Sequence, residues 1–196
     1  MTIQRIIGID PGIARMGYGI IDVNGNHLRP VAFGCIETPA HTPVGNRLRQ
    51  IYEELSALVQ QHKPDAMAVE ELFFNRNTTT AFTVGQARGV AILAGVQAGV
   101  SLAEYTPMEV KLAVVGYGRA DKAQVQEMVR VLLALAERPK PDDTADALAV
   151  AITHAHTAPL HSALSAQGSR TSLGVPAPQR TIARRPASEV GKGPKR

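Results

Sequence analysis

Residues 3–12 read Ile3-Gln4-Arg5-Ile6-Ile7-Gly8-Ile9-Asp10-Pro11-Gly12, and this stretch decides the fold. Its apolar residues up to Ile9 predict a strand, and Asp10-Pro11-Gly12 has the residue types of a tight turn. Open α/β sheets bind their ligands outside the carboxyl ends of their strands. The stretch therefore predicts an α/β sheet with an acidic side chain at its ligand-binding edge.

The flanking sequence predicts a mixed sheet covered by helices. Residues 18–23 and 28–37 predict two more strands, and Asn24-Gly25 between them is a hairpin signal, so the sheet begins as an antiparallel meander. Short strands are also predicted at residues 66–69, where an apolar run is typical of a buried parallel strand, and at residues 101–105. Helical spacing and caps predict helices at residues 44–62, 78–99, 107–115 and 121–135, and from Asp142 or Asp143 to about His156.

Composition narrows the function classes. The chain has 196 residues, 44% hydrophobic and 19% charged, which is ordinary for a globular protein. It has no apolar run of about 18 residues, so we expect no membrane span. Asp10-Pro11-Gly12 interrupts the apolar start, which argues against a signal peptide, and the single Cys35 fits a reducing compartment. We therefore expect a cytoplasmic protein.

The basic charge is confined to the end of the chain. Of 21 basic and 17 acidic residues, residues 159–196 hold seven basic and one acidic, which leaves 14 basic and 16 acidic for the rest. This segment is rich in Pro, Ser, Ala, Gly and Arg and lacks periodic apolar residues, which predicts a disordered basic tail. We predict one α/β domain over residues 1–157 and a tail over residues 158–196, which either has no role or adds sequence-independent affinity for a polyanion.

Acidic residues supply the candidate chemistry. Asp10 and Glu70 follow two central strands, although each alone is also explained as a turn or a solvated strand end. Asp143 and Asp146 are three apart at the start of the last helix and share a face. Asp142 is a natural cap for that helix. Asp146 stands in an almost wholly apolar helix, where an unpaired carboxylate is costly, so a bound metal ion would explain it.

A set of ligands made only of carboxylate oxygens favours Mg²⁺ or Mn²⁺ over Zn²⁺. Two such ions about 3.5–4 Å apart can stabilise the attacking and leaving oxygens of a phosphodiester. His154 and His156 lie farther along the same helix. We expect these histidines to pack or to lie at the surface rather than to bind metal.

Five blocks of sequence, in one order from about Ile6 to His156, carry a resemblance to a known family. They are Ile9-Asp10-Pro11-Gly12 with Gly17-Tyr18-Gly19; Val69-Glu70 with Phe73-Phe74 and Asn77; Gly85-Gln86-Ala87-Arg88-Gly89-Val90-Ala91; Val114-Val115-Gly116 with Lys122; and Asp143 with Ala145-Asp146-Ala147-Leu148-Ala149 and Ile152-Thr153-His154. In these blocks the chain resembles the RuvC family of bacterial Holliday-junction resolvases.

The resemblance implies a ribonuclease H-like fold, a mixed five-stranded sheet flanked by helices. It also implies a homodimer that cuts four-way DNA junctions with two Mg²⁺ ions per active site, or with Mn²⁺ as a substitute, and leaves 5′-phosphate ends. A branch-migration motor is the implied partner. Matched position by position, the catalytic metal ligands are Asp10, Glu70, Asp143 and Asp146, and the residues facing DNA are Phe73, Lys111 and Lys122.

Some alternatives stay open at this point. Asp142 and Asp143 are neighbours, so either of them could be the metal ligand, although the spacing to Asp146 favours Asp143. The Gly/Ala-rich face of residues 78–99 suits either contact between subunits or close packing on the chain's own sheet. A non-catalytic junction-binding adaptor of the same fold is a second function class. An actin-like ATPase or sugar kinase is a third, but it needs a duplicated domain for which the chain is too short.

Overall fold

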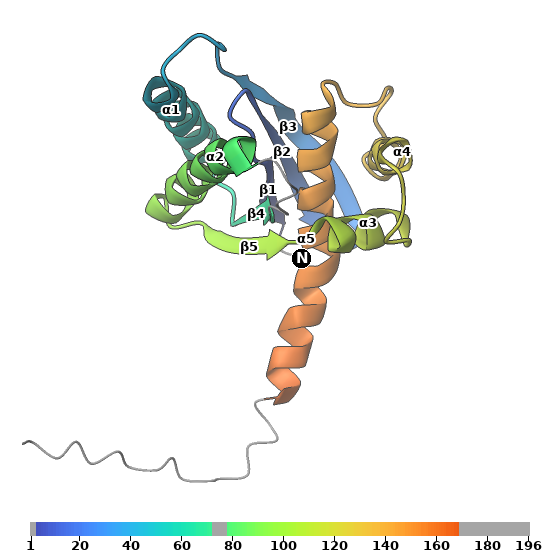
Figure 1. The fold of residues 1–196 in the computed structure, drawn as a ribbon. Coiled ribbons are helices and arrows are strands. Elements are labelled where there is room, and N and C mark those ends of the chain that lie inside the picture. Colours follow the sequence, from blue (N-terminus) through green and yellow to red (C-terminus); the bar gives the residue numbers. More distant parts are fainter. Residues whose placement is uncertain (1–2, 72–77, 169–196) are drawn as a thin grey trace, which may run out of the picture.

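The computed structural model describes residues 3–71 and 78–168 and confirms the mixed five-stranded sheet (Figure 1). The strand order is β3-β2-β1-β4-β5. The strands are β1 (Gln4–Asp10), β2 (Arg15–Asn24), β3 (His27–Glu37), β4 (Ala66–Glu70) and β5 (Ser101–Tyr105). The helices are α1 (Val44–His62), α2 (Thr78–Gln97), α3 (Pro107–Val115), α4 (Lys122–Leu132) and α5 (Asp142–Gly168).

The sheet changes from antiparallel to parallel at β1. This strand pairs antiparallel with β2 and parallel with β4, and β4 pairs parallel with β5. Ile9 is opposite Val69 in the parallel pair. Asp10 and Glu70 each follow these paired residues, so the carboxyl ends of β1 and β4 bring both acidic residues to one edge of the sheet.

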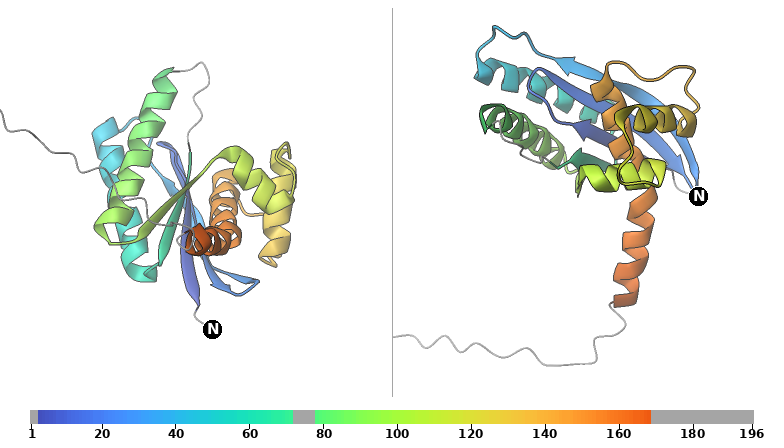
Figure 2. Two further views of the ribbon diagram at one scale, coloured as in Figure 1. Left: turned by 90° about the horizontal axis from the view of Figure 1, so that it is seen from below. Right: turned by 45° about the vertical axis from the view of Figure 1, so that its right-hand side comes forward.

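The helices cover both faces of the sheet. Figure 2 shows α1 and α2 on one side and α3, α4 and α5 on the other. One core joins Ile7, Ile20 and Met67 to α1 and α2. The other joins Ile6, Ile21 and Ala68 to α3, α4 and α5. Alternate residues of β1 thus point into different cores, as the side-chain period of a strand requires.

Glycines in the central strands let α5 lie directly on the sheet. A Cβ atom on Gly8 would come 2.1 Å from the carbonyl oxygen of Ala147, and one on Gly17 would come 2.0 Å from that of Asp143. A Cβ on Gly19 would meet Leu148 Cγ at 2.7 Å. These distances are far below van der Waals contact, so only glycine fits. The close packing brings the first turn of α5 to the same sheet edge as Asp10 and Glu70.

Three helices differ in length from the sequence prediction. Helix α2 ends at Gln97 rather than at Gly99. Helix α5 continues to Gly168 instead of ending near His156, and Figure 1 shows its last part projecting beyond the sheet. The prediction was wrong because Pro159 signals the end of a helix, whereas the residues after it include strong helix formers such as Ala163 and Leu164. Helix α4 ends at Leu132 and not at Leu135, because Ala134 has a left-handed backbone with φ 49°.

The strands β1, β2, β3 and β4 extend slightly beyond their predicted limits. Strand β2 begins at Arg15 rather than Tyr18, because its first residues pair with the end of β3, Arg15 with Glu37. The predicted disordered tail begins at residue 158, but residues 158–168 form the end of α5, so the prediction is wrong there; the rest of the tail lies outside the described residues. Within residues 3–71 and 78–168, no helix is long and apolar enough to cross a membrane.

Candidate active site

Four carboxylates lie in one region, at the edge of the sheet where β1 and β4 end, near enough to influence one another's pKa values. Asp10 and Glu70 are the last residues of those strands, and both are largely buried. Asp143 and Asp146 project from the first two turns of α5, which the strand glycines hold against β1 and β2. The structure thus assembles the four acidic residues that the sequence singled out from three elements far apart in the chain.

The pKa values show that the carboxylates interact. Burial raises the pKa of Asp10 to about 8, and the charges of Glu70, Asp146 and Asp143 add to that rise. Burial raises the pKa of Glu70 to about 7, with a further contribution from Asp146. The pKa of Asp146 is also raised, first by burial, although Lys122 opposes the shift. Concentrated negative charge in a partly dry site favours a compensating cation.

Two cations from the chain already contact the carboxylates. Lys122 Nζ lies 2.9 Å from Asp146 Oδ2. Arg15 Nε lies 3.2 Å from Asp143 Oδ2, but this buried oxygen accepts no hydrogen bond among the described residues. Asp143 therefore offers an oxygen with an unused lone pair, which is what a hard metal ion needs.

The donor set fits a divalent cation by its chemistry, but the side chains do not yet converge. Among the described residues, no three His, Cys, Asp or Glu side chains stand close enough together to hold one ion. The donors are all carboxylate oxygens, which Mg²⁺ prefers. The ion pair with Lys122 uses Oδ2 of Asp146, and the second carboxylate oxygen, Oδ1, is the one that a metal ion would bind.

The structure separates Asp142 from Asp143. The Asp142 side chain is 62% exposed, and it accepts a hydrogen bond of 3.0 Å from Gln126 Nε2. The Asp143 side chain is only 25% exposed, and its charge contributes to the raised pKa of Asp10. Asp143 therefore lies beside Asp10, while Asp142 lies toward α4, although Asp142 Oδ2 is 3.5 Å from Lys122 Nζ and its charge also helps to raise the pKa of Asp146.

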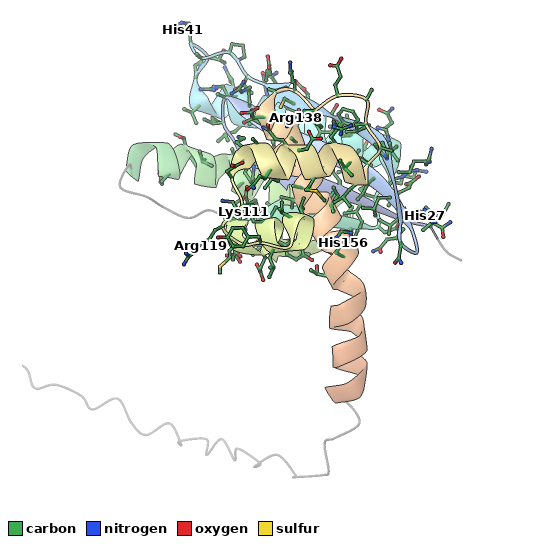
Figure 3. All side chains as sticks on the ribbon, turned by 90° about the vertical axis from the view of Figure 1, so that its right-hand side faces the viewer. His27, His41, Lys111, Arg119, Arg138 and His156 are labelled. Carbon is green, nitrogen blue, oxygen red and sulfur yellow. The ribbon has the colours of Figure 1, made fainter. Side chains whose placement is uncertain are left out.

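A cavity of about 230 Å³ adjoins the carboxylate cluster. Glu70 and Asp146 form one side of it, and the predicted DNA-facing residues Lys111 and Lys122 also line it. Figure 3 labels Lys111 on α3. The remaining walls are apolar, from Pro107, Val110, Val125 and Ala149. Phe73, the third predicted DNA-facing residue, lies outside the described residues.

The histidines of α5 lie away from the carboxylates, as predicted. His154 Nδ1 is 2.8 Å from the hydroxyl of Tyr105, and His156 Nδ1 is 3.2 Å from the carbonyl oxygen of Ala113. These contacts tie α5 to β5 and α3. The histidines therefore serve packing between elements rather than the acidic cluster.

Sequence reasoning missed two arginines near the site. Arg15, at the start of β2, contacts Asp143. Arg88, on α2, donates a hydrogen bond of 3.2 Å from Nε to the carbonyl oxygen of Glu70. Arg88 lies within the block Gly85-Gln86-Ala87-Arg88-Gly89. This block contributes to the family resemblance, but the sequence alone assigns no function to Arg88. Nothing in the local sequence around Arg15 points to Asp143.

Comparisons with known proteins agree with this geometry. The family model described as "Crossover junction endodeoxyribonuclease RuvC" matches residues 6–154. The protein of that name from Desulfitobacterium hafniense is 62% identical over 152 residues, 78% of this chain and 92% of the relative. The one from Chloroflexus aurantiacus is 58% identical over 156 residues, 80% of this chain and 95% of the relative.

Solved structures of related proteins share the fold of this chain. Thermus thermophilus RuvC in complex with Holliday junction substrate superposes with a TM-score of 0.77 at 38% identity, over 81% of this chain and 96% of that one. The yeast mitochondrial Holliday junction resolvase Ydc2 shares the fold, with a TM-score of 0.59 at 13% identity. Fold, site and sequence agree, and the chain belongs to the RuvC family of crossover junction endodeoxyribonucleases.

Proposed function

We propose that this chain resolves Holliday junctions by metal-dependent hydrolysis of phosphodiester bonds, with 5′-phosphate ends as products. The observation that carries the proposal is the cluster of Asp10, Glu70, Asp143 and Asp146, in which burial and mutual repulsion raise the pKa of three carboxyl groups. The T. thermophilus relative with Holliday junction substrate supports the choice of a four-way DNA junction.

Asp10, Glu70, Asp143 and Asp146 would hold the divalent cations, two Mg²⁺ per active site with Mn²⁺ as a substitute. When bound, the ions activate a water nucleophile and neutralise the charge that develops on the phosphate oxygens. Oxygen-only ligation supports Mg²⁺ or Mn²⁺ rather than a metal that prefers nitrogen or sulfur.

The chain's own residues bind and orient the DNA strand. A phosphate that enters the cavity beside Glu70 meets the ammonium groups of Lys111 and Lys122. These groups offset the repulsion between the phosphate and the acidic cluster, and the phosphate contacts fix the register of the strand. Phe73 is proposed to stack on a base near the junction centre, which is worth about 1–3 kcal/mol in other proteins.

A nicking assay tests the proposed activity. The protein is incubated with a synthetic four-way junction, and with a linear duplex of the same sequence, in Mg²⁺ and in EDTA. We expect incisions in the junction only, and only with Mg²⁺. Junction binding without any incision would mean a non-catalytic adaptor, whereas equal cutting of the linear duplex would contradict selectivity for junctions.

A homodimer is the proposed assembly, formed through one face of α2. Phe82, Leu93 and Val96 are exposed there, and a Cβ on Gly85 or Gly89 would touch nothing within 4 Å. Gly95 differs, since a Cβ there would come 2.7 Å from Met67 Sδ. The small residues of α2 therefore serve two purposes: Gly95 packs on the chain's own sheet, while Gly85 and Gly89 leave an open surface for a second copy.

The Gly89→Arg substitution should convert the dimer into a monomer, because a long charged side chain would enter the proposed interface. Sedimentation velocity measures the change in oligomeric state. In a cleavage assay, the monomer should no longer cut the two opposed strands of a junction together. Gly45→Arg is the matched control, since Gly45 is also an exposed helical glycine with nothing within 4 Å. If Gly89→Arg sediments like the wild type, the interface lies elsewhere.

The remaining assignments concern the protein's surroundings. We propose a cytoplasmic enzyme that works with a branch-migration motor. We also propose that residues 1–157 hold the nuclease, while the end of the chain adds sequence-independent affinity for DNA. All seven basic residues of the proposed tail follow Gly168, where α5 ends.

A further inference from the structure

Arg88 holds a position that the proposed chemistry leaves unexplained. Arg88 lies on α2, which packs against the face of the sheet opposite α5. Its side chain is only 20% exposed. Its guanidinium donates from Nε to the Glu70 carbonyl oxygen at 3.2 Å and from Nη2 to Glu104 Oε1 at 2.6 Å. One side chain from α2 thus bridges the ends of β4 and β5.

Regular strand pairing holds the backbone of Glu70 from one side only, because β5 still pairs with it through Tyr105 whereas β1 does not. The β1–β4 ladder ends at Ile9 and Val69, one residue short of Glu70. On the β5 side, Glu71 donates its backbone N–H to the Tyr105 carbonyl oxygen at 2.8 Å. The hydrogen bond from Arg88 adds a fixed point at the Glu70 carbonyl, at the last residue before the chain leaves the sheet.

Glu104 makes Arg88 a rigid support. A guanidinium is planar, and its donors have a fixed separation, so two simultaneous acceptors determine its orientation. Glu104 lies on β5, the strand next to β4, and its ion pair fixes the far side of the group. Because its charge is already paired and its side chain is mostly buried, Arg88 is a poor candidate for a contact with a DNA phosphate.

We infer that Arg88, held by Glu104, is a positioning residue for Glu70: it fixes the backbone from which the proposed metal-ligating carboxylate projects. The inference rests on the proposed function of Glu70. A displacement of about 1 Å at a reacting group can cost about 100-fold in rate. A support for the Glu70 backbone therefore acts on metal binding and on cleavage, but not on junction binding.

The test compares Arg88→Met with the wild type in three measurements. These are the Mg²⁺ concentration that gives half of the maximal rise in melting temperature, the single-turnover cleavage rate on a synthetic junction, and the junction Kd in EDTA. For Arg88→Met we expect a Mg²⁺ midpoint at least about threefold higher and cleavage about tenfold slower. The Kd should stay within about twofold of the wild-type value.

Conservative and control variants sharpen the test. Arg88→Lys keeps the charge but cannot bridge both acceptors as a planar group does, so it should restore only part of the loss. Glu104→Gln removes the charge that holds Arg88 and should shift the Mg²⁺ midpoint in the same direction by a smaller factor. Arg49→Met is the matched control, because Arg49 forms an exposed ion pair with Glu53 on α1, and it should change nothing.

Three results would overturn the inference. The first is slower cleavage with an unchanged Mg²⁺ midpoint and a lower melting temperature, which would make Arg88 a general structural residue. The second is weaker junction binding with a normal rate at saturation, which would make it a DNA contact. The third is a Glu104→Gln variant with the same Mg²⁺ midpoint and cleavage rate as the wild type. This result would refute the inference even if Arg88→Met fails to fold. A wild-type protein that cuts no junction would instead refute the proposed function.

Discussion

Asp10→Asn is expected to abolish junction cleavage and, in EDTA, to raise the melting temperature of the protein. The amide takes away a negative oxygen that the proposed metal site needs. Replacing residues that only hydrogen-bond to metal ligands lowers activity by up to about 100-fold, so the loss of cleavage rate in Asp10→Asn should be larger. The amide also cannot ionise, so it removes the free-energy cost of keeping a carboxyl group where burial and the charges of Glu70, Asp146 and Asp143 disfavour its charged form. Junction binding in EDTA should persist, since DNA contacts come from basic side chains.

The pH dependence follows from the direction of the same shift. The pKa of Asp10 is about 8 in the folded protein, against about 3.9 for an ordinary Asp in the unfolded chain. The folded state therefore holds its proton more tightly, and stability falls as the pH rises from about 4 to about 8. Glu70, with a pKa of about 7, acts in the same direction. In EDTA the wild-type melting temperature should fall across this range, and that of Asp10→Asn should fall less.

Asp142→Asn is the control for this experiment, because its carboxylate is exposed and lies toward Gln126. It should cut at a rate near that of the wild type, whereas Glu70→Gln, Asp143→Asn and Asp146→Asn should be inactive. Melting curves between pH 5 and pH 9 and a gel-based cleavage assay provide the measurements. An active Asp143→Asn beside an inactive Asp142→Asn would show that the ligand was assigned to the wrong neighbour.

Gly8→Ala should destabilise the fold by more than about 3 kcal/mol. The added Cβ would lie 2.1 Å from the Ala147 carbonyl oxygen and 2.6 Å from the Ala151 nitrogen, both backbone atoms of α5. Backbone cannot turn aside as a flexible side chain can, so the whole helix must shift. A loss of that size lowers the melting temperature by about 6–12 °C in a domain of this length.

Gly45→Ala provides the comparison for Gly8→Ala. Gly45 is exposed near the start of α1, and a Cβ there meets nothing within 4 Å. Alanine should leave stability unchanged or raise it by up to about 1 kcal/mol, because it favours helix more than glycine does. Thermal melts of both variants separate a packing effect from a general cost of replacing glycine. Equal stability of the two variants would mean that α5 can move away from the sheet without cost.

Local patterns were sufficient to predict the elements but not all of their contacts. The ranges of α1, α3 and β5 agree with prediction, because caps and breakers such as Pro107 and Gly116 mark their ends. Asp10 and Glu70 were found because each follows a strand. Arg15 and Arg88 were missed because their partners are far away in sequence, and only the folded sheet brings them together. The end of α5 was predicted too early because Pro159 signals the end of a helix, although helix-forming residues follow it.

The order of the elements along the chain has a consequence for synthesis. Asp10 and Glu70 leave the ribosome early, while Asp143 and Asp146 lie on α5, the last element among the described residues. Domains generally fold as units during synthesis, and this sheet lacks the helix that covers one of its faces until α5 has emerged. A nascent chain therefore holds only half of the proposed metal ligands. The nuclease becomes competent only when nearly the whole domain is complete, so unfinished chains pose no threat to the cell's DNA.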